Sequence, residues 1–191
     1  MSTIVAVIKN GTACMAADSL TTFGDTRQAA DYVVDANKIL CFDDSFIGVV
    51  GSAAHHLVLR SVFANHRDKI DFSSQLAVFE TLRTLHPILK DDYFLNSKDH
   101  DEDAYETSRI DALVMSPAGL FGIYALREVD QYTRFWAVGS GAEFALGAMH
   151  AVFDDADSAE AVATAGINAG ATFDTSSALP MNSFSIKLQK N

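Results

Sequence analysis

The sequence predicts an α+β fold, a four-layer αββα sandwich in which two antiparallel β-sheets are stacked face to face and helices cover both outer faces. Two observations predict it. Segments with strand or helix periodicity follow one another in the order strands, two helices, strands, two helices. In addition, 49% of the 191 residues are apolar, which is enough for a sizeable core, and no linker-like stretch divides the chain. We therefore expect one domain over residues 1–191.

The first half of the chain contains two predicted hairpins followed by two helices. Each hairpin consists of two runs rich in β-branched and other apolar residues on either side of a short polar turn such as Asn10-Gly11. Apolar residues then recur every three to four positions, the spacing of a helix with one buried face, and Pro87 is expected beyond the end of the second helix. The predicted strands are 3–8, 12–18, 38–42 and 46–50, and the predicted helices span about 52–63 and 76–85.

The second half repeats this order, and its last helix has a recognisable start. Pro117-Ala118-Gly119 predicts the turn between two of its strands. Asp157 and Glu160 have the spacing of a capping box at the start of the last helix. The predicted strands are 110–116, 120–126, 133–138 and, as the final element, 183–188, and the predicted helices are 141–153 and 158–173.

Charge and composition exclude several classes of partner. The net charge of −11 would repel phosphate backbones, so we expect no nucleic-acid partner. No apolar run reaches the roughly 18 residues of a membrane span, and the short apolar start lacks the features of a signal peptide, so we expect a cytoplasmic protein without a membrane partner. Cys14 and Cys41 lie in apolar stretches and are expected to be small buried residues in a reducing compartment.

Ser2 follows the initiator methionine, where a small residue favours removal of Met1 and exposure of a free amine. An N-terminal hydroxyl residue carries a nucleophile and a base in one amino acid. The α-amine, with an unperturbed pKa of about 7.7 to 8.0, can take up the hydroxyl proton near neutral pH. Because very many proteins begin with Met-Ser, this hypothesis depends on the rest of the sequence.

Seven short segments, in register along the whole chain, resemble the proteasome β-subunit family. The likeness is closest to its small bacterial members, HslV and the homologue described from β-proteobacteria. The segments are Ser2-Thr3-Ile4-Val5-Ala6-Val7, Ala16-Ala17-Asp18-Ser19, Thr21-Thr22-Phe23-Gly24, Asn37-Lys38-Ile39, Gly51-Ser52-Ala53-Ala54, Val138-Gly139-Ser140-Gly141 and Asp174-Thr175-Ser176-Ser177. The resemblance implies the N-terminal nucleophile hydrolase fold and peptidase activity.

The resemblance also assigns roles to individual residues. Ser2 falls on the family's N-terminal nucleophile, and Asp18 and Lys38 fall on the acid and the lysine beside it. The Lys38 ammonium would lower the pKa of the α-amine and keep it a neutral base, and Asp18 would hold Lys38 in place. The backbone N–H of Gly51 resembles the oxyanion donor. The surrounding polar residues of the family correspond to Ser140, Asp174 and Ser177.

A substrate pocket and an assembly follow from the same resemblance. The pocket residues are small to medium and mostly apolar, which favours a neutral side chain before the scissile bond. They are Thr21, Ala36, Leu40, Val49 and Ala53, and Thr22 is expected to pair with substrate through its main chain. The family forms homo-oligomeric double rings of 12 or 14 subunits, often with a ring-shaped ATPase unfoldase, and degrades unfolded proteins or peptides.

No cofactor or metal is expected. The acidic run from Lys98 to Asp103 lacks the spacing and the glycine of a calcium loop and is expected to be a solvated loop. His55 and His56 are adjacent in a predicted helix, so their side chains diverge and cannot bind one ion together. We expect them on the helix surface or at a subunit contact.

Two alternatives to the endopeptidase remain open from the sequence. The first is a catalytically weak or inactive homologue that forms rings, and the second is an amidohydrolase that acts on small amides. Ser2 differs from the threonine of the family because serine lacks the methyl group that restricts χ1. Slower cleavage of peptides than with a threonine nucleophile is therefore expected.

Overall fold

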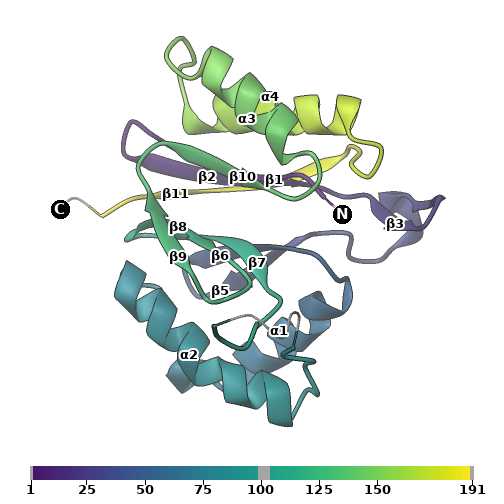
Figure 1. Ribbon diagram of the computed structural model, residues 1–191. Helices are drawn as coiled ribbons and strands as arrows, with labels where there is room; N and C mark the ends of the chain where they lie inside the picture. Colours follow the sequence, from purple (N-terminus) through teal and green to yellow (C-terminus); the bar gives the residue numbers. More distant parts are fainter. Residues whose placement is uncertain (1, 99–103, 190–191) are drawn as a thin grey trace.

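The computed structural model describes residues 2–98 and 104–189 and has four layers (Figure 1). Two antiparallel sheets lie face to face in the middle, one helix pair covers the outer face of the first sheet, and the other pair covers the second. The predicted αββα sandwich is confirmed.

The first sheet has the strand order β10-β1-β2-β11. Its centre is the hairpin of β1 and β2, with Asn10 and Gly11 at positive φ in the turn, as the sequence predicts. The first four residues of β1 are fully buried because both faces of the strand are covered. The strands are β1 (Ile4–Lys9), β2 (Thr12–Asp18), β10 (Phe135–Val138) and β11 (Met181–Lys187).

The second sheet has the strand order β5-β6-β7-β8-β9, each strand antiparallel to its neighbours. It contains the second predicted hairpin and the strands that follow the first helix pair. The strands are β5 (Ile39–Phe42), β6 (Ser45–Val50), β7 (Asp111–Ser116), β8 (Gly119–Ile123) and β9 (Val129–Tyr132).

Four helices form the outer layers: α1 (Ala54–Asn65) and α2 (Gln75–Asp91) on the second sheet, and α3 (Ala142–Val152) and α4 (Ala159–Phe173) on the first. Short 3-10 turns lie at Ala30–Tyr32 and Arg67–Lys69.

Three apolar cores separate the four layers. Alternate residues of β1 point to opposite faces, so Ile4 joins the core between the sheets and Val5 joins the core under α3 and α4. Burial of a side chain of this size stabilises the fold by about 1.5 to 3 kcal/mol. The other cores include Met15, Leu113 and Leu120 between the sheets, Met149, Val162 and Ile167 under α3 and α4, and Leu85, Val114 and Phe121 under α1 and α2.

Three strand predictions need correction. A small hairpin, β3 (Thr21–Phe23) with β4 (Thr26–Gln28), is not predicted because three-residue strands are too short to show periodicity. The strand expected over 120–126 ends at Ile123 because the chain turns there, with the N–H of Arg127 bonded to the carbonyl of Tyr124 at 2.8 Å. The strand β9 was not predicted, and it lies between β8 and the strand expected at 133–138, which forms as β10.

Two helix predictions also need correction. Pro87 lies inside α2, and the helix continues to Asp91 because Leu85 and Leu89 on either side of the proline are buried against the second sheet. Ser158, not Asp157, caps α4, and its hydroxyl accepts the N–H of Ala161 at 3.1 Å.

The two cysteines differ in burial. Cys14 is buried in the middle of the first sheet, as expected, and Cys41 is exposed. Cys41 lies on β5, an edge strand of the second sheet, where fewer neighbours cover a side chain. Of the acidic run from Lys98 to Asp103, residues 99–103 lie outside the described residues.

Candidate active site

Asp18, the last residue of β2, is fully buried and lies at the centre of a polar cluster beside the start of β1. Its Oδ1 accepts the N–H of Thr3 at 2.9 Å and the Lys38 ammonium at 2.8 Å. Its Oδ2 accepts the N–H groups of Leu20 at 3.0 Å and Ala178 at 3.1 Å. Four donors from four segments therefore satisfy this buried carboxylate.

Lys38 directly precedes β5 and reaches Asp18 from the second sheet. Only 13% of its side chain is exposed. Burial lowers the pKa of Lys38 from its ordinary value, and the negative charges of Asp18 and Asp174 partly oppose this effect. The Asp18–Lys38 ion pair joins the two sheets at one end of the sandwich.

The backbone of Ser2 is held from the other side by the segment between β10 and α3. The carbonyl of Ser2 accepts the N–H of Gly141 at 3.3 Å. Gly139 has φ +99°, and a Cβ at that position would lie 2.0 Å from the Ser2 carbonyl oxygen, so only glycine permits this approach. The carbonyl of Thr3 accepts the N–H of Asp18 at 3.1 Å. Ser2 is 6% exposed and its main chain is fixed.

A second carboxylate, Asp174, lies directly after α4 and accepts three hydrogen bonds. Its Oδ2 accepts the hydroxyls of Ser140 and Ser177, both at 2.7 Å, and its Oδ1 accepts the N–H of Ser176 at 3.2 Å. Burial by itself would raise the pKa of Asp174, but the hydrogen bonds from Ser177, Ser140 and Ser176 outweigh burial and lower the pKa.

Thr3 connects the two carboxylate clusters and is a residue that sequence reasoning missed. Its main chain bonds to Asp18, and its hydroxyl lies 2.7 Å from the hydroxyl of Ser177. In the sequence, Thr3 is simply one β-branched residue at the start of a predicted strand. Its partner Ser177 is 174 positions away, so no local pattern could indicate the contact.

Gly51 follows β6 and has φ +102°, a conformation that favours glycine. The preceding residue, Val50, lies close to Gly139: a Cβ built on Gly139 would be 3.3 Å from Val50 Cγ1. Because Gly139 also contacts the carbonyl of Ser2, the end of β6 lies at the same end of the sandwich as the start of β1.

Of the six residues expected to form a substrate pocket, four are half-buried or exposed and two are buried in a core. Thr21 and Thr22 are half-buried in β3, and Ala36 is half-buried in the segment that leads to Lys38. Ala53 is exposed at the start of α1. Leu40 and Val49, at 4% and 8% exposure, instead belong to the apolar core between the second sheet and α1 and α2.

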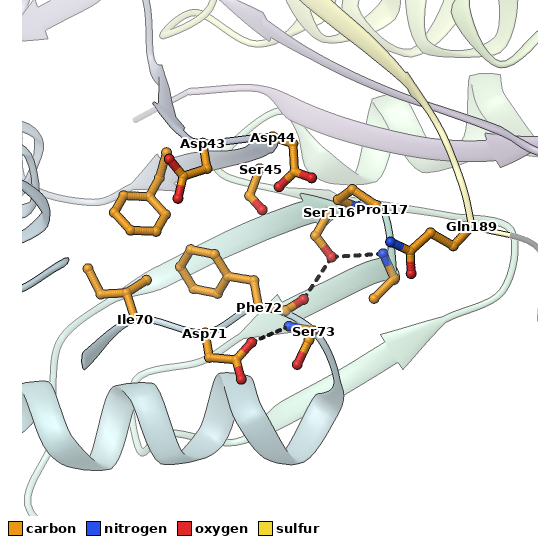
Figure 2. A pocket seen from close by; sticks show the side chains of 12 residues that line it. Asp43, Asp44, Ser45, Ile70, Asp71, Phe72, Ser73, Ser116, Pro117 and Gln189 are labelled. Atoms are coloured by element: carbon orange, nitrogen blue, oxygen red, sulfur yellow. Dashed lines mark hydrogen bonds between the residues drawn. The ribbon is translucent and has the colours of Figure 1, made fainter. Parts of the chain in front are cut away.

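Surface hollows formed by the described residues lie beside the second sheet. One, of about 220 Å³, is lined by Asp43, Asp44 and Asp71 among others (Figure 2). Polar groups of this hollow are bonded to one another: the hydroxyl of Ser116 donates to the carbonyl of Phe72 at 2.8 Å, and Asp71 accepts the N–H of Ser73 at 2.8 Å. Another hollow, of about 390 Å³, lies between β5 and α1. Neither is lined by Asp18, Lys38 or Asp174.

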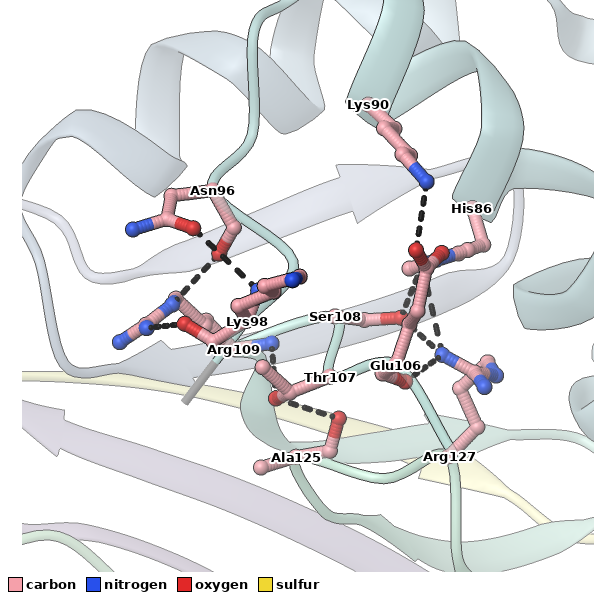
Figure 3. Close-up of polar contacts among 10 residues, drawn as sticks. All are labelled: His86, Lys90, Asn96, Lys98, Glu106, Thr107, Ser108, Arg109, Ala125 and Arg127. Carbon is pink, nitrogen blue, oxygen red and sulfur yellow. Dashed lines mark hydrogen bonds and ion pairs between the residues drawn. The ribbon is translucent and has the colours of Figure 1, made fainter. Parts of the chain in front are cut away.

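A Ser–His–Glu arrangement also lies apart from these residues (Figure 3). The hydroxyl of Ser108 is 2.9 Å from His86 Nδ1, and His86 Nε2 is 3.1 Å from the carboxylate of Glu106. Ser108 is only 2% exposed, and the guanidinium of Arg127 donates to its hydroxyl at 3.1 Å. A buried serine held in this way cannot attack a substrate, so the arrangement is a structural tie between α2 and the segment before β7.

His55 and His56 lie in the first turn of α1 and contact different segments. His55 interacts with the backbone of Arg109 and His56 with the backbone of Lys38, and burial lowers the pKa of both imidazoles. Their side chains diverge as expected. Within residues 2–98 and 104–189, no group of three or more His, Cys, Asp or Glu side chains is placed to hold a metal ion.

The fold and this cluster together define a class of protein. An αββα sandwich whose first strand begins directly after a hydroxyl residue is the fold of the N-terminal nucleophile hydrolases, and in this chain the Asp18–Lys38 pair lies beside that start.

Comparisons with solved structures identify the family within this class. BPH of Thiobacillus denitrificans in complex with epoxomicin is 38% identical, over 98% of this chain and 100% of that chain, with a TM-score of 0.91. A second structure of Thiobacillus denitrificans BPH is 39% identical, over 99% and 100% of the two chains, with a TM-score of 0.92. Eukaryotic HslV from Trypanosoma brucei, 21% identical over 97% and 99%, shares the fold with a TM-score of 0.73. No protein-family model and no curated protein matches the chain.

The chain belongs to the family of proteasome β-type, HslV-like proteins, and the resemblance noted in the sequence is confirmed. This is a protease-type family of the N-terminal nucleophile class. Among the described residues, no helix combines the length and the apolar character required to cross a membrane.

Proposed function

We propose that this protein is an N-terminal serine endopeptidase that works inside a homo-oligomeric double ring. Removal of Met1 frees the amine of Ser2, and the Ser2 hydroxyl then attacks the peptide bond of an unfolded protein or peptide. A homo-oligomer of 12 or 14 copies in the cytoplasm, with or without a ring-shaped ATPase unfoldase, is part of the proposal.

The proposed reaction uses one amino acid as both nucleophile and base. The α-amine of Ser2 accepts the hydroxyl proton while Oγ bonds to the substrate carbonyl carbon. The N–H of Gly51 stabilises the resulting oxyanion, a contribution of about 3 kcal/mol for a well-placed donor. The α-ammonium returns the proton to the leaving amine, and water then hydrolyses the ester so that Ser2 is regenerated.

The single observation that carries this proposal is that Thr3 and Lys38 share one oxygen of Asp18. The N–H of Thr3 belongs to the peptide bond that joins it to Ser2, and it is 2.9 Å from the oxygen that accepts the Lys38 ammonium at 2.8 Å. The Lys38 ammonium is therefore held close to the peptide bond between Ser2 and Thr3, and Ser2 is the residue that carries the proposed amine. Like-charge repulsion at this range lowers the pKa of an amine and favours its neutral, basic form.

Asp174, Ser140 and Ser177 have a different part in the proposal. Their hydrogen bonds fix the segment after α4 beside Thr3, and the Asp174 carboxylate makes a smaller contribution than Asp18 to balancing the positive charge of Lys38. Thr21, Ala36 and Ala53 are proposed to contact the side chain before the scissile bond, with Leu40 and Val49 behind them, and Thr22 is proposed to pair with the substrate main chain.

The test combines intact mass with a covalent probe. Protein from its native host is expected to lack Met1. An epoxyketone such as epoxomicin, which reacts with both the hydroxyl and the amine of an N-terminal residue, is expected to add one equivalent at Ser2. The variant Ser2→Ala should form no adduct and cleave no peptide, whereas Ser2→Thr should do both.

Retention of Met1 in the native protein would overturn the proposal and favour an inactive ring-forming homologue. A processed protein that forms the adduct but cleaves only small amides would favour the amidohydrolase instead. Cleavage of unfolded protein by the wild type, absent in Ser2→Ala, is the outcome that supports an endopeptidase.

A further inference from the structure

Thr3 directly follows Ser2, and hydrogen bonds hold both its main chain and its side chain. Its side chain is fully buried, and its hydroxyl is 2.7 Å from that of Ser177. We propose that Thr3 is a positioning residue whose hydroxyl donates to Ser177 and thereby keeps the Ser2 amine in its basic form. This inference depends on the proposed function, because it concerns the base of that reaction.

The direction of the hydrogen bonds follows from the Asp174 carboxylate, at which the series of hydrogen bonds ends. Ionised Asp174 can only accept, so the hydroxyl of Ser177 uses its single proton to donate to it at 2.7 Å. The contact between Ser177 and Thr3 then requires a proton from Thr3. The Thr3 hydroxyl therefore donates to the Ser177 hydroxyl, which in turn donates to the Asp174 carboxylate.

Two glycines enclose the Thr3 side chain and fix its orientation. A Cβ on Gly141 would lie 2.0 Å from the Thr3 hydroxyl oxygen, and a Cβ on Gly170 would lie 2.4 Å from it. Real Cβ atoms do not approach other heavy atoms this closely, so α4 and the segment before α3 must present glycine here. Threonine is β-branched and stiff at χ1, which suits a hydroxyl that must keep one direction.

In this proposal the bond from Thr3 changes the hydrogen bonding of Ser177, whose hydroxyl lies 2.7 Å from the side chain of the residue after Ser2. A hydroxyl that already accepts a hydrogen bond is polarised, donates more strongly to Asp174 and is a poorer acceptor for a further donor. Without the Thr3 hydroxyl, Ser177 would accept more readily from an ammonium at residue 2, and Asp174 would keep more of its negative charge. Both changes favour the charged amine, which cannot act as a base. The Lys38 ammonium, which Asp18 holds on the other side, opposes that charge and is the same in the wild type and the variants.

The experiment measures peptide cleavage and epoxomicin adduct formation against pH for the full chain. Thr3→Val keeps the shape and removes the hydroxyl, and kcat/KM at neutral pH is expected to fall about fivefold, the loss typical of one neutral hydrogen bond. The acid limb of the pH profile is expected to move to higher pH, so the rate recovers as the pH rises. Thr172→Val, at an exposed threonine of α4 whose hydroxyl bonds within its own helix, is the matched control and should leave the profile unchanged.

A second pair of variants covers the case in which Thr3→Val does not fold. Thr3→Ser and Thr3→Ala both lose the methyl group and differ only in the hydroxyl. Thr3→Ser should retain the wild-type acid limb, and Thr3→Ala should show the displaced one. A change of rate by the same factor at every pH would indicate a purely structural role and overturn the inference.

The remaining outcomes separate this inference from the proposed function. A wild-type protein that lacks Met1 and forms no adduct at Ser2 would overturn the proposed function, and the role of Thr3 with it. A reactive wild type whose rate and pH profile are matched by Thr3→Val and by Thr3→Ala would overturn only the role of Thr3.

Discussion

The Asp18–Lys38 pair allows a stability prediction that does not depend on catalysis. The variants are Asp18→Asn, Lys38→Met and the double variant. An asparagine has one acceptor oxygen where Asp18 has two, so its NH₂ group would face two of the four donors now bonded to the carboxylate. Each buried donor left without a partner costs about 1 to 3 kcal/mol, and breaking a buried ion pair from one side costs about 3 to 5 kcal/mol. We expect Asp18→Asn to lose about 3 to 5 kcal/mol.

The measurement is urea unfolding of all four proteins at one protomer concentration. The coupling energy of the cycle should be about 2 kcal/mol, because removing Lys38 as well takes away the charge that the carboxylate balances. The matched control is Arg60–Asp35, a pair at 3.0 Å whose side chains are about half exposed, for which we expect less than about 1 kcal/mol. A coupling at Asp18–Lys38 no larger than in the control would refute the argument that burial makes this pair important.

The same proteins give a pH dependence with a defined sign. Burial lowers the pKa of Lys38 below 10.5, so between the lowered value and 10.5 the folded protein binds fewer protons than the unfolded chain. The stability of the wild type should therefore rise with pH across this window relative to Lys38→Met. A difference between the two proteins that stays constant up to pH 10.5 would contradict the assignment.

Two further predictions concern other parts of the fold. Gly139→Ala should destabilise the protein and abolish adduct formation at residue 2, since its Cβ would lie 2.0 Å from the Ser2 carbonyl oxygen and φ is +99°; unfolding in urea and intact mass check both effects, and wild-type values would show that the Ser2 main chain is not held there. A hydrogen bond from Lys90, and a weaker effect of the one from His86, lower the pKa of Glu106 to about 2. The ionised Glu106 side chain therefore contributes to stability above the ordinary carboxyl pKa of 4.5, and this contribution is lost as the pH falls toward 2. Thermal melts of Glu106→Gln and wild type should converge over that range, and parallel curves would exclude the effect.

Local pattern was sufficient for most of the fold because the sandwich is built from adjacent hairpins and helix pairs. The pair of strands around Asn10 and Gly11 forms as the turn chemistry predicts, and helices form where the apolar spacing predicts them. The predicted buried faces of α1 and α2 are wrong in part, because Leu57, Leu76 and Phe79 are exposed. The errors occur where tertiary packing overrides local preference. Pro87 is tolerated within α2 because the leucines around it are buried, and β3 and β4 are too short to have a period.

The site could be predicted only in part, because its contacts join distant segments. Resemblance brought Asp18 and Lys38 into one hypothesis, and the structure shows the 2.8 Å contact between them, which composition and periodicity could not indicate. Thr3 was missed for the same reason: its hydroxyl partner Ser177 lies at the other end of the chain. Polar residues at strand ends are therefore the positions at which sequence patterns of this fold are least informative.

The arrangement of the two carboxylates explains why so many residues around Ser2 are small or polar. Asp18 binds the main chain after Ser2 and the lysine charge, while Asp174 binds the hydroxyls that reach Thr3. Both sets converge on a segment of two residues, so any side chain larger than glycine at 139, 141 or 170 would enter the space that the segment occupies. The glycines are therefore a consequence of fixing the start of the chain, and their loss should affect Ser2 even though none of them takes part in proton transfer.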